Sequence, residues 1–248
     1  MASGSMGCEG GLVSPPQIQP LDPRRFLSVT VSEGYPGFFD IESDGASDSI
    51  HVAVSQQNHT FTLDGVTYSD VAYIEVHGGG GDDDIVVQST DGSGDIGAGV
   101  SGDDGNDSIT LNFDGGVWGG NGDDTLYLSD SFYGVADGGA GNDSVYVLGS
   151  CVSADIEGGD GNDLLDGTMS DLGLTLHGGL GDDTIMGSAY DDEIYGDGGR
   201  DMLFGNAGND TFYAADGSGC HINGGSGTDI CYANGSEASI TNVEYVFT

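Results

Sequence analysis

Residues 178–213 read GGLGDDTIM GSAYDDEIY GDGGRDMLF GNAGNDTFY, four consecutive nine-residue units with Asp at the sixth place and an apolar residue at the eighth. The same unit recurs from residue 78 to residue 232. Six copies with the full Gly-Gly-x-Gly-x-Asp turn begin at Gly78, Gly119, Gly138, Gly158, Gly178 and Gly224, and four looser copies begin at Gly102, Gly187, Gly196 and Gly205. This phasing indicates a repeat architecture rather than a flexible glycine-rich linker, because linkers lack a fixed apolar place.

The residue types of this turn suit one kind of ligand. Glycine is needed where the chain takes positive φ or passes close to a bound ion. Calcium is a hard cation that takes six to eight oxygen ligands at about 2.3–2.6 Å. Turn carbonyls and carboxylates supply such oxygens. The repeat therefore predicts calcium binding by the sixth-place aspartates, which are Asp83, Asp107, Asp124, Asp143, Asp163, Asp183, Asp192, Asp201, Asp210 and Asp229.

The eighth place of each unit predicts the core. An apolar residue there, two places after the aspartate, starts a short strand and points inward. The inward row reads Ile85, Ile109, Leu126, Val145, Leu165, Ile185, Ile194, Leu203, Phe212 and Cys231.

These repeats resemble those of the RTX family of secreted bacterial calcium-binding proteins, over residues 78–232. The resemblance implies an all-β fold, a right-handed parallel β-roll (a β-solenoid) of nonapeptide repeats with β caps. It implies that each calcium lies between consecutive turns on one edge, held by the sixth-place aspartates and by turn carbonyls. The carbonyls implied are those of Gly78, Gly80, Gly119, Asn121, Gly138, Ala140, Gly158, Asp160, Gly178, Leu180, Gly196, Gly198, Gly205, Ala207, Gly224 and Ser226.

Some residues depart from the repeat pattern. Tyr190 replaces the fourth-place glycine of its unit, and Asp103 and Asp197 replace second-place glycines. The motif is therefore weakened locally at these turns.

Repeat spacing assigns the turns to two edges. From Gly119 to Gly178 the starts fall 19, 20 and 20 residues apart, so only alternate half-turns carry the motif and only one edge binds calcium. From Gly178 to Gly205 the starts fall nine apart, so both edges bind. Residues 215–220 form a decayed turn with Cys220 in the aspartate place. Pairing same-edge neighbours predicts about six to eight ions.

The charge of the chain points to the same ligand. The net charge is −39, with no lysine and only three arginines. Nucleic acid and anionic membrane surfaces are excluded as partners, because both need basic side chains. Crowded carboxylates oppose compaction. We therefore expect the chain to be largely unfolded without calcium and to fold on binding it.

The flanks divide the chain further. Residues 1–25 are expected to be a flexible N-terminus that starts with a probable vector scar, and residues 26–77 a β cap or degenerate solenoid coils. Strands are expected over 26–31, 49–54, 60–63 and 71–76. Residues 43–51 are a decayed repeat with Asp48 and Ile50 in the aspartate and apolar places. The β-roll covers 78–232, and 233–248 form a C-terminal cap. No apolar run is long enough to span a membrane.

Catalytic motifs are missing from the sequence. It has no HExxH and no GxSxG, and its five histidines are scattered. We therefore expect no enzyme activity. Cys8, Cys151, Cys220 and Cys231 do not have zinc-site spacing, and a Cys220–Cys231 disulfide is left open.

The ninth place of each unit faces outward and is rich in aromatic residues. Such a row can be a partner surface for self-association, a surface protein or a glycan, or it can be a cross-strand ladder that stabilises the sheet. The candidate residues are Tyr127, Tyr146, Tyr195, Tyr213 and Tyr232.

The sequence thus predicts a calcium-binding, non-enzymatic β-roll that acts as a structural, adhesive or self-assembling protein. The resemblance implies that it is secreted or lies at the surface of a bacterium. The alternative is a calcium-dependent folding and secretion module of a larger secreted enzyme or toxin.

Overall fold

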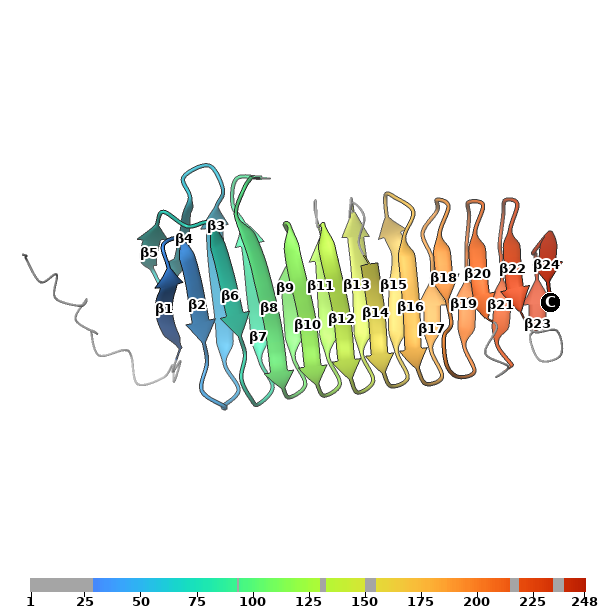
Figure 1. The fold of residues 1–248 in the computed structure, drawn as a ribbon, viewed down its shortest axis with the longest axis horizontal. Coiled ribbons are helices and arrows are strands. Elements are labelled where there is room, and N and C mark those ends of the chain that lie inside the picture. Colours follow the sequence, from blue (N-terminus) through green and yellow to red (C-terminus); the bar gives the residue numbers. More distant parts are fainter. Residues whose placement is uncertain (1–28, 93, 130–132, 150–154, 215–218, 234–238) are drawn as a thin grey trace, which may run out of the picture.

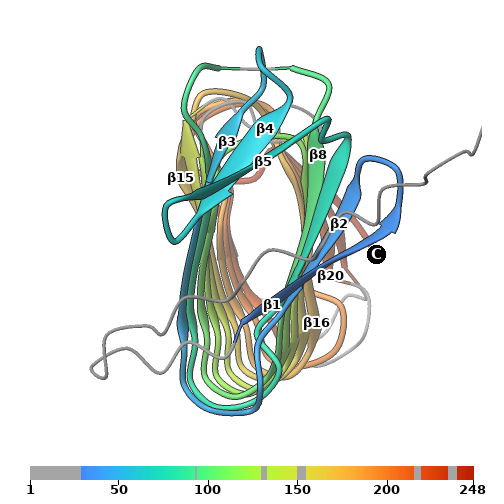
Figure 2. The same cartoon turned by 90° about the vertical axis from the view of Figure 1, so that its left-hand side faces the viewer.

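The computed structural model describes residues 29–92, 94–129, 133–149, 155–214, 219–233 and 239–248. Their strands form two twelve-stranded sheets that face each other along the length of the molecule (Figure 1, Figure 2). No helix in these residues is long and apolar enough to cross a membrane. The all-β parallel solenoid predicted from the repeats is confirmed.

The two sheets collect alternate strands of the chain. Sheet A contains β1 (Thr30–Tyr35), β2 (Phe38–Glu42), β6 (Tyr73–His77), β8 (Gly97–Asp104), β10 (Gly115–Asn121), β12 (Gly134–Ala140), β14 (Asp155–Asp160), β16 (Thr175–Leu180), β18 (Glu193–Tyr195), β20 (Thr211–Ala214), β22 (Ile230–Ala233) and β24 (Tyr245–Phe247). Sheet B contains β3 (Ser49–Ser55), β4 (Thr60–Leu63), β5 (Val66–Ser69), β7 (Asp84–Ser89), β9 (Ser108–Leu111), β11 (Thr125–Ser129), β13 (Ser144–Gly149), β15 (Leu164–Ser170), β17 (Thr184–Met186), β19 (Met202–Phe204), β21 (His221–Asn223) and β23 (Ser239–Thr241).

Parallel pairing places equivalent residues of successive coils on top of one another. In sheet B, Leu126 pairs with Ile109 on one side and Val145 on the other. In sheet A, Val117 pairs with Val100 and Ala136. Each place of the repeat therefore forms a row along the solenoid axis, as expected for a fold in which every unit contacts its neighbours.

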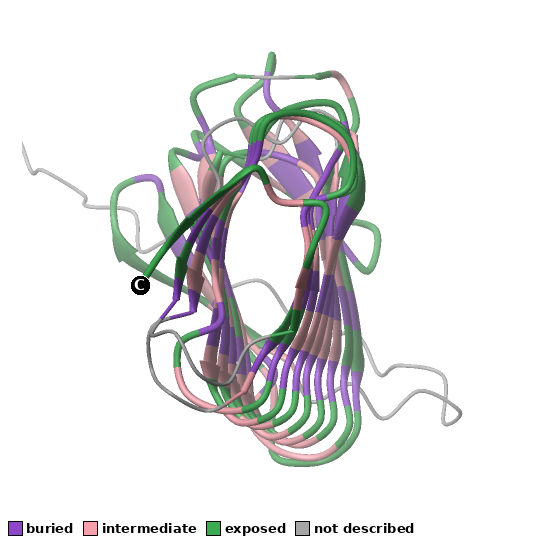
Figure 3. Cartoon of the chain, turned by 90° about the vertical axis from the view of Figure 1, so that its right-hand side faces the viewer, coloured by how far each residue is buried: buried purple, intermediate pink, exposed green. Residues whose placement is uncertain are grey.

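The core consists of two apolar rows that meet between the sheets. All ten residues of the predicted inward row are fully buried, which confirms that prediction. Seven of them lie on sheet B, whereas Ile194, Phe212 and Cys231 lie on sheet A. The row on sheet A begins earlier in the chain, with buried residues two places before a first glycine that sequence reasoning did not identify: Val76, Val100, Val117, Ala136, Ile156 and Leu176. Figure 3 shows these buried stripes between exposed turns.

The N-terminal end departs from the parallel pattern. β1 pairs antiparallel with β2, and β3, β4 and β5 form an antiparallel meander at the edge of sheet B. The strands expected over 49–54, 60–63 and 71–76 are β3, β4 and β6. The strand expected over 26–31 lies mostly outside the described residues, and β2 and β5 were not predicted. The Phe-Phe-Asp-Ile alternation after a Tyr-Pro-Gly turn could have indicated β2.

Fourth-place glycines allow neighbouring turns to stack closely. Gly141 has φ of 139°, and a Cβ added there would clash with the carbonyl oxygen of Gly122 in the preceding turn. Gly65 also has positive φ, at 78°, but a Cβ added to it would meet nothing within 4 Å. A residue with a Cβ would be strained at both positions, which differ in the space around them.

We predict that Gly65→Ala costs about 1–2 kcal/mol of stability through backbone strain alone. Gly141→Ala should cost about 1–3 kcal/mol more, because two backbone segments must also move apart. Denaturant unfolding in saturating calcium measures both. Equal losses for the two variants would contradict the close stacking of turns.

Candidate metal-binding columns

The sixth-place aspartates line up in two columns, one on each edge of the solenoid. The lower column, at the bottom of Figure 1, lies in turns that lead from sheet A to sheet B, and the upper column lies in turns that return from sheet B to sheet A. The lower column contains Asp48, Asp83, Asp107, Asp124, Asp143, Asp163, Asp183 and Asp201. The upper column contains Asp192, Asp210 and Asp229 and ends at Glu244.

A hydrogen-bond relay holds each column together. Up to the last aspartate of each column, the backbone N–H of one aspartate donates to the Oδ1 atom of the aspartate in the next turn. In the lower column these bonds run from 2.6 Å at Asp48 to 3.2 Å at the Asp183–Asp201 step. In the upper column Leu174 donates to Asp192 at 2.7 Å, and Asp229 donates to Glu244 Oε2 at 2.8 Å. In every column aspartate after Asp48, one carboxylate oxygen is thus used to fix the side chain.

The other carboxylate oxygen is left without a donor in most turns. Eight column aspartates have a buried Oδ2 atom with no hydrogen-bond partner, and all eight are at most 3% exposed. They are Asp83, Asp107, Asp124, Asp143, Asp163, Asp183, Asp210 and Asp229. Buried charged oxygens are normally paired or bound to a metal, so each of these atoms points to an ion.

The first-place glycines keep open the space that these oxygens face. A Cβ added to Gly158 would lie 2.6 Å from Asp163 Oδ2 and 2.5 Å from the carbonyl oxygen of Gly178 in the next turn. A Cβ added to Gly78 would lie 2.7 Å from Asp83 Oδ2 and 2.6 Å from the carbonyl oxygen of Gly102. A carboxylate oxygen and a carbonyl oxygen therefore converge on each gap. These donors fit calcium, which prefers hard oxygen ligands.

Backbone oxygens must supply most of the coordination. In the described residues, no three His, Cys, Asp or Glu side chains gather in a group that could hold a metal. The first-place carbonyls predicted as ligands include Gly178 and Gly196, whose oxygens face the gaps at Gly158 and Gly178. The carbonyls of Gly102 and Asn242 occupy equivalent places and were not predicted.

Third-place carbonyls also take part in the stacking of turns. They accept hydrogen bonds of 2.7–3.1 Å from the fourth-place N–H of the preceding turn. A carbonyl has a second lone pair, so this bond leaves it able to bind an ion. The predicted ligands engaged in this way are Asn121, Ala140, Asp160, Leu180, Gly198 and Ser226.

The fifth place forms an exposed ladder that sequence reasoning missed. Asn142 donates its backbone N–H to Asp123 Oδ1 at 2.8 Å, and Asn162 donates to Asn142 Oδ1 at 3.0 Å. The ladder continues through Asp182 to the N–H of Arg200. The signal was present, because the fifth place is Asp or Asn in eight of the ten units. These side chains cap turn N–H groups at the surface.

Burial shifts the titration of the column carboxylates. Desolvation is the main cause, and it outweighs the backbone hydrogen bond that favours the charged form; neighbouring carboxylates add to the shift for most of the group. It raises the pKa of Asp107, Asp143, Asp183 and Asp210 to about 7 and that of Asp83 and Asp124 to about 6. The pKa values of Asp163, Asp192 and Asp229 are raised too. Without a cation, these buried groups therefore resist ionisation.

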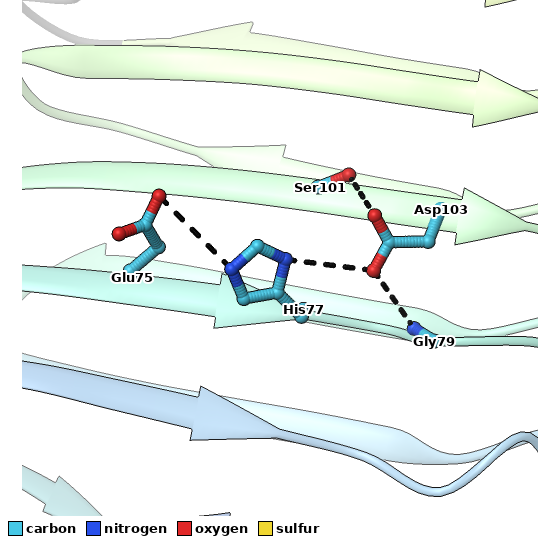
Figure 4. Close-up of polar contacts among 5 residues, drawn as sticks. All are labelled: Glu75, His77, Gly79, Ser101 and Asp103. Atoms are coloured by element: carbon cyan, nitrogen blue, oxygen red, sulfur yellow. Dashed lines mark hydrogen bonds and ion pairs between the residues drawn. The ribbon is translucent and has the colours of Figure 1, made fainter. Parts of the chain in front are cut away.

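Two departures from the glycine pattern pair with histidines. Asp103, at φ of 69°, accepts hydrogen bonds from Gly79 N at 3.2 Å and Ser101 Oγ at 2.6 Å, and lies 3.5 Å from His77 Nδ1 (Figure 4). Asp197 lies 3.2 Å from His177 Nδ1 in the same way. These pairs are partly exposed, so they contribute little stability. All ion pairs found in the described part of the chain involve histidine.

The outward aromatic residues form stacks along both sheets. Tyr127 and Tyr146 stack at 5.3 Å on sheet B. On sheet A the centroids of His177, Tyr195, Tyr213, Tyr232 and Phe247 follow at 4.2, 4.4, 5.3 and 5.2 Å. Stacking occupies the ring faces that a sugar would contact, which favours the ladder interpretation. Burial and the Glu193 carboxylate raise the pKa of Tyr195 to about 12.

The two described cysteines are not bonded to each other. Cys220 and Cys231 are both buried, and desolvation raises the pKa of Cys231 to about 11. Cys231 belongs to the inward row, whereas Cys220 takes the aspartate place of the lower column. The disulfide left open by the sequence is not formed in this structure, and Cys8 and Cys151 lie outside the described residues.

Comparison with known proteins agrees with this geometry. A family model for the RTX calcium-binding nonapeptide repeat matches the chain in four copies, at residues 117–131, 135–148, 155–169 and 177–217. These segments contain the last five aspartates of the lower column, from Asp124 to Asp201, and Asp192 and Asp210 of the upper column. No curated protein matches the chain.

We predict that acid favours the calcium-free fold. Groups whose pKa is raised on folding stabilise the folded state below their unfolded pKa, and this contribution is lost as pH rises through about 6–7. Strand content of calcium-free protein, measured by circular dichroism, should therefore increase as pH falls from about 8 to 5. Protein in saturating calcium is the control and should change little. A strand content that falls as pH is lowered over this range would contradict the raised pKa values of the column aspartates.

We also predict that Tyr213→Ser lowers stability by about 1–3 kcal/mol, because it removes two stacking contacts. Tyr133→Ser is the control: Tyr133 is 58% exposed, and its loss should change stability by less than about 0.5 kcal/mol. Denaturant unfolding in saturating calcium compares them. A Tyr213 variant as stable as the control would show that the ladder is not structural.

Proposed function

The chain carries RTX calcium-binding nonapeptide repeats folded as a parallel β-solenoid, and from this premise we propose that it is a secreted protein that folds on binding calcium. Calcium binding by the β-roll follows from the repeats themselves. The coupling of binding to folding, the location outside the cell and the structural role are the proposal.

The observation that carries the proposal is the stack of buried, unpartnered carboxylate oxygens. Successive turns follow the strand spacing of about 4.8 Å, so neighbouring ionised groups repel by about 3 kcal/mol at an effective dielectric constant of about 20. Six such groups follow one another from Asp83 to Asp183. When all six are ionised, the summed repulsion is comparable to the net stability of a typical domain, which is about 5–15 kcal/mol.

The residues of the chain provide what the folded state needs to hold an ion. Each gap brings together a carboxylate oxygen and a carbonyl oxygen from adjacent turns, and the N–H relay fixes the carboxylate in place. Calcium, when bound, supplies the positive charge that the chain lacks. Because the gaps exist only when turns are stacked, binding free energy is folding free energy.

Two features support a location outside the cell. Relatives with RTX repeats are typically secreted by bacteria. The chain also has a net charge of −39, so its folding would depend on calcium that is scarce in cytosol. It could then remain unfolded during export and fold outside.

A structural role agrees with how the carboxylates and aromatic residues are used. In the described residues every buried aspartate belongs to a column, and the outward aromatic residues stack with one another. We therefore propose binding and assembly rather than catalysis.

Association of the C-terminal end is a second candidate function. The last strand of sheet A, β24, exposes Tyr245, Val246 and Phe247 by 54, 45 and 52%. It pairs with β22 and has no neighbour on its other side in the described residues. An open apolar edge of this kind is suited to strand addition.

We expect calcium added to chelator-stripped protein to produce a cooperative gain of strand signal in far-UV circular dichroism. Light scattering in the same titration tests assembly: constant mass indicates a monomeric module, and growing mass indicates self-association. A strand-rich spectrum before calcium is added would refute folding on calcium. Magnesium at equal ionic strength is the control, since its stricter octahedral geometry suits these sites poorly.

A further inference from the structure

Three column aspartates differ from the other eight in having a protein donor on the second oxygen. Asp48 Oδ2 accepts a hydrogen bond from Ser43 Oγ. Asp192 Oδ2 accepts from Ser188 N at 2.7 Å and Ser188 Oγ at 3.2 Å. Asp201 Oδ2 accepts from Cys220 Sγ at 3.2 Å. None of the three Oδ2 atoms is among the unpartnered buried atoms.

Each donor lies at an end of a column. Asp48 is the first aspartate of the lower column and Asp201 is the last. Asp192 is the first aspartate of the upper column. Between these positions the unpartnered aspartates follow without interruption.

Ser43 fills the gap that a glycine leaves open elsewhere. It stands at the first place of the decayed unit 43–51, where the full repeats have glycine. In those repeats an added Cβ would point at the second carboxylate oxygen. In the decayed unit the Ser43 hydroxyl bonds to that oxygen on Asp48.

The turn that contains Ser188 has a different backbone. In the nine other repeat units, both the second and the fourth place have positive φ. In this turn Ser188 and Tyr190 occupy those places, and neither has positive φ. The altered path brings both the N–H and the hydroxyl of Ser188 onto Asp192, while the Tyr190 N–H donates to Ser188 Oγ at 3.0 Å.

Cys220 ends the lower column by replacing a carboxylate. It takes the aspartate place after Asp201 and is 2% exposed. A thiol is a weak acceptor and a weak donor. Its sulfur lies at hydrogen-bonding distance from the second oxygen of Asp201, where the other turns leave that oxygen unpartnered.

We infer that protein donors terminate the calcium columns: Asp48, Asp192 and Asp201 are capped by Ser43, Ser188 and Cys220, and ions bind only at the eight aspartates with an unpartnered oxygen. The lower column then holds six ions and the upper column two. Asp192 and Asp201, predicted as ligands from the motif, become structural residues that hold the ends of the relay. This inference rests on calcium binding by the roll.

Calcium per chain, measured by equilibrium dialysis and elemental analysis, tests the assignment with a matched pair of substitutions. Asp163→Asn and Asp192→Asn make the same change at sites that are 3% and 2% exposed. We expect eight ions for the parent, at least one fewer for Asp163→Asn, and eight for Asp192→Asn. Loss of an ion from Asp192→Asn, or nine or more ions on the parent, would overturn the inference.

A gain of binding gives a second test that does not depend on a damaged site. Ser188→Gly with Tyr190→Gly restores the glycines of the full motif and removes the hydroxyl donor, so we expect a ninth ion. An unchanged count would show that the donor does not decide occupancy.

The same samples separate this inference from the proposed function. Circular dichroism during calcium addition reports folding, whereas the ion count reports which turns are occupied. A parent that folds with calcium but violates the expected counts refutes the donor assignment alone. A parent that binds no calcium refutes calcium-coupled folding itself.

Discussion

A buried carboxylate oxygen without a donor, repeated in successive turns, is the constraint on which this structure depends. The backbone relay uses one oxygen of each aspartate and holds the other in a dry gap between turns, as at Asp143 and Asp163. Such an arrangement is costly when it is ionised and unpaired. It becomes favourable when a cation with a demand for oxygen ligands enters the gap. This arrangement is the physical basis of the calcium-coupled folding proposed above.

Parallel stacking repeats the same interactions in every coil along the solenoid axis. Because equivalent residues lie on top of one another, every place of the repeat becomes a row with one chemical character. Leu126 and Val145 belong to an apolar row, Tyr195 and Tyr213 to an aromatic stack, and the column aspartates to a charged one. Repetition stabilises the apolar and aromatic rows, because their side chains pack on one another, and destabilises the charged row, because like charges repel. The edges thus limit the stability of the solenoid, and the sheets between them supply it.

Where a column stops, the local sequence changes in a way that removes the need for an ion. Ser43 introduces a hydroxyl into the gap, and the Ser188 turn changes its backbone path to offer an N–H as well. At the C-terminal end, Glu244 continues the relay from outside the repeats by accepting the N–H of Asp229. Sequence reasoning identified the decayed units at residues 43 and 215 but not these donors. Hydrogen-bond direction depends on φ at single residues, and the motif does not encode it.

The sequence by itself determined the repeat, the inward row and the alignment of the sixth-place aspartates, because nine-residue periodicity forces equivalent residues into equivalent places. It also assigned the turns to the two edges, since repeat starts about 20 residues apart fall on the same edge and starts nine residues apart fall on opposite edges. Only the tertiary structure decided which carboxylate oxygens are left unpartnered, and which are met by Ser43, Ser188 or Cys220. It likewise decided that β1, β4 and β5 run antiparallel. These outcomes depend on contacts between different coils and on the direction of single side chains, and a local pattern of residue types carries neither.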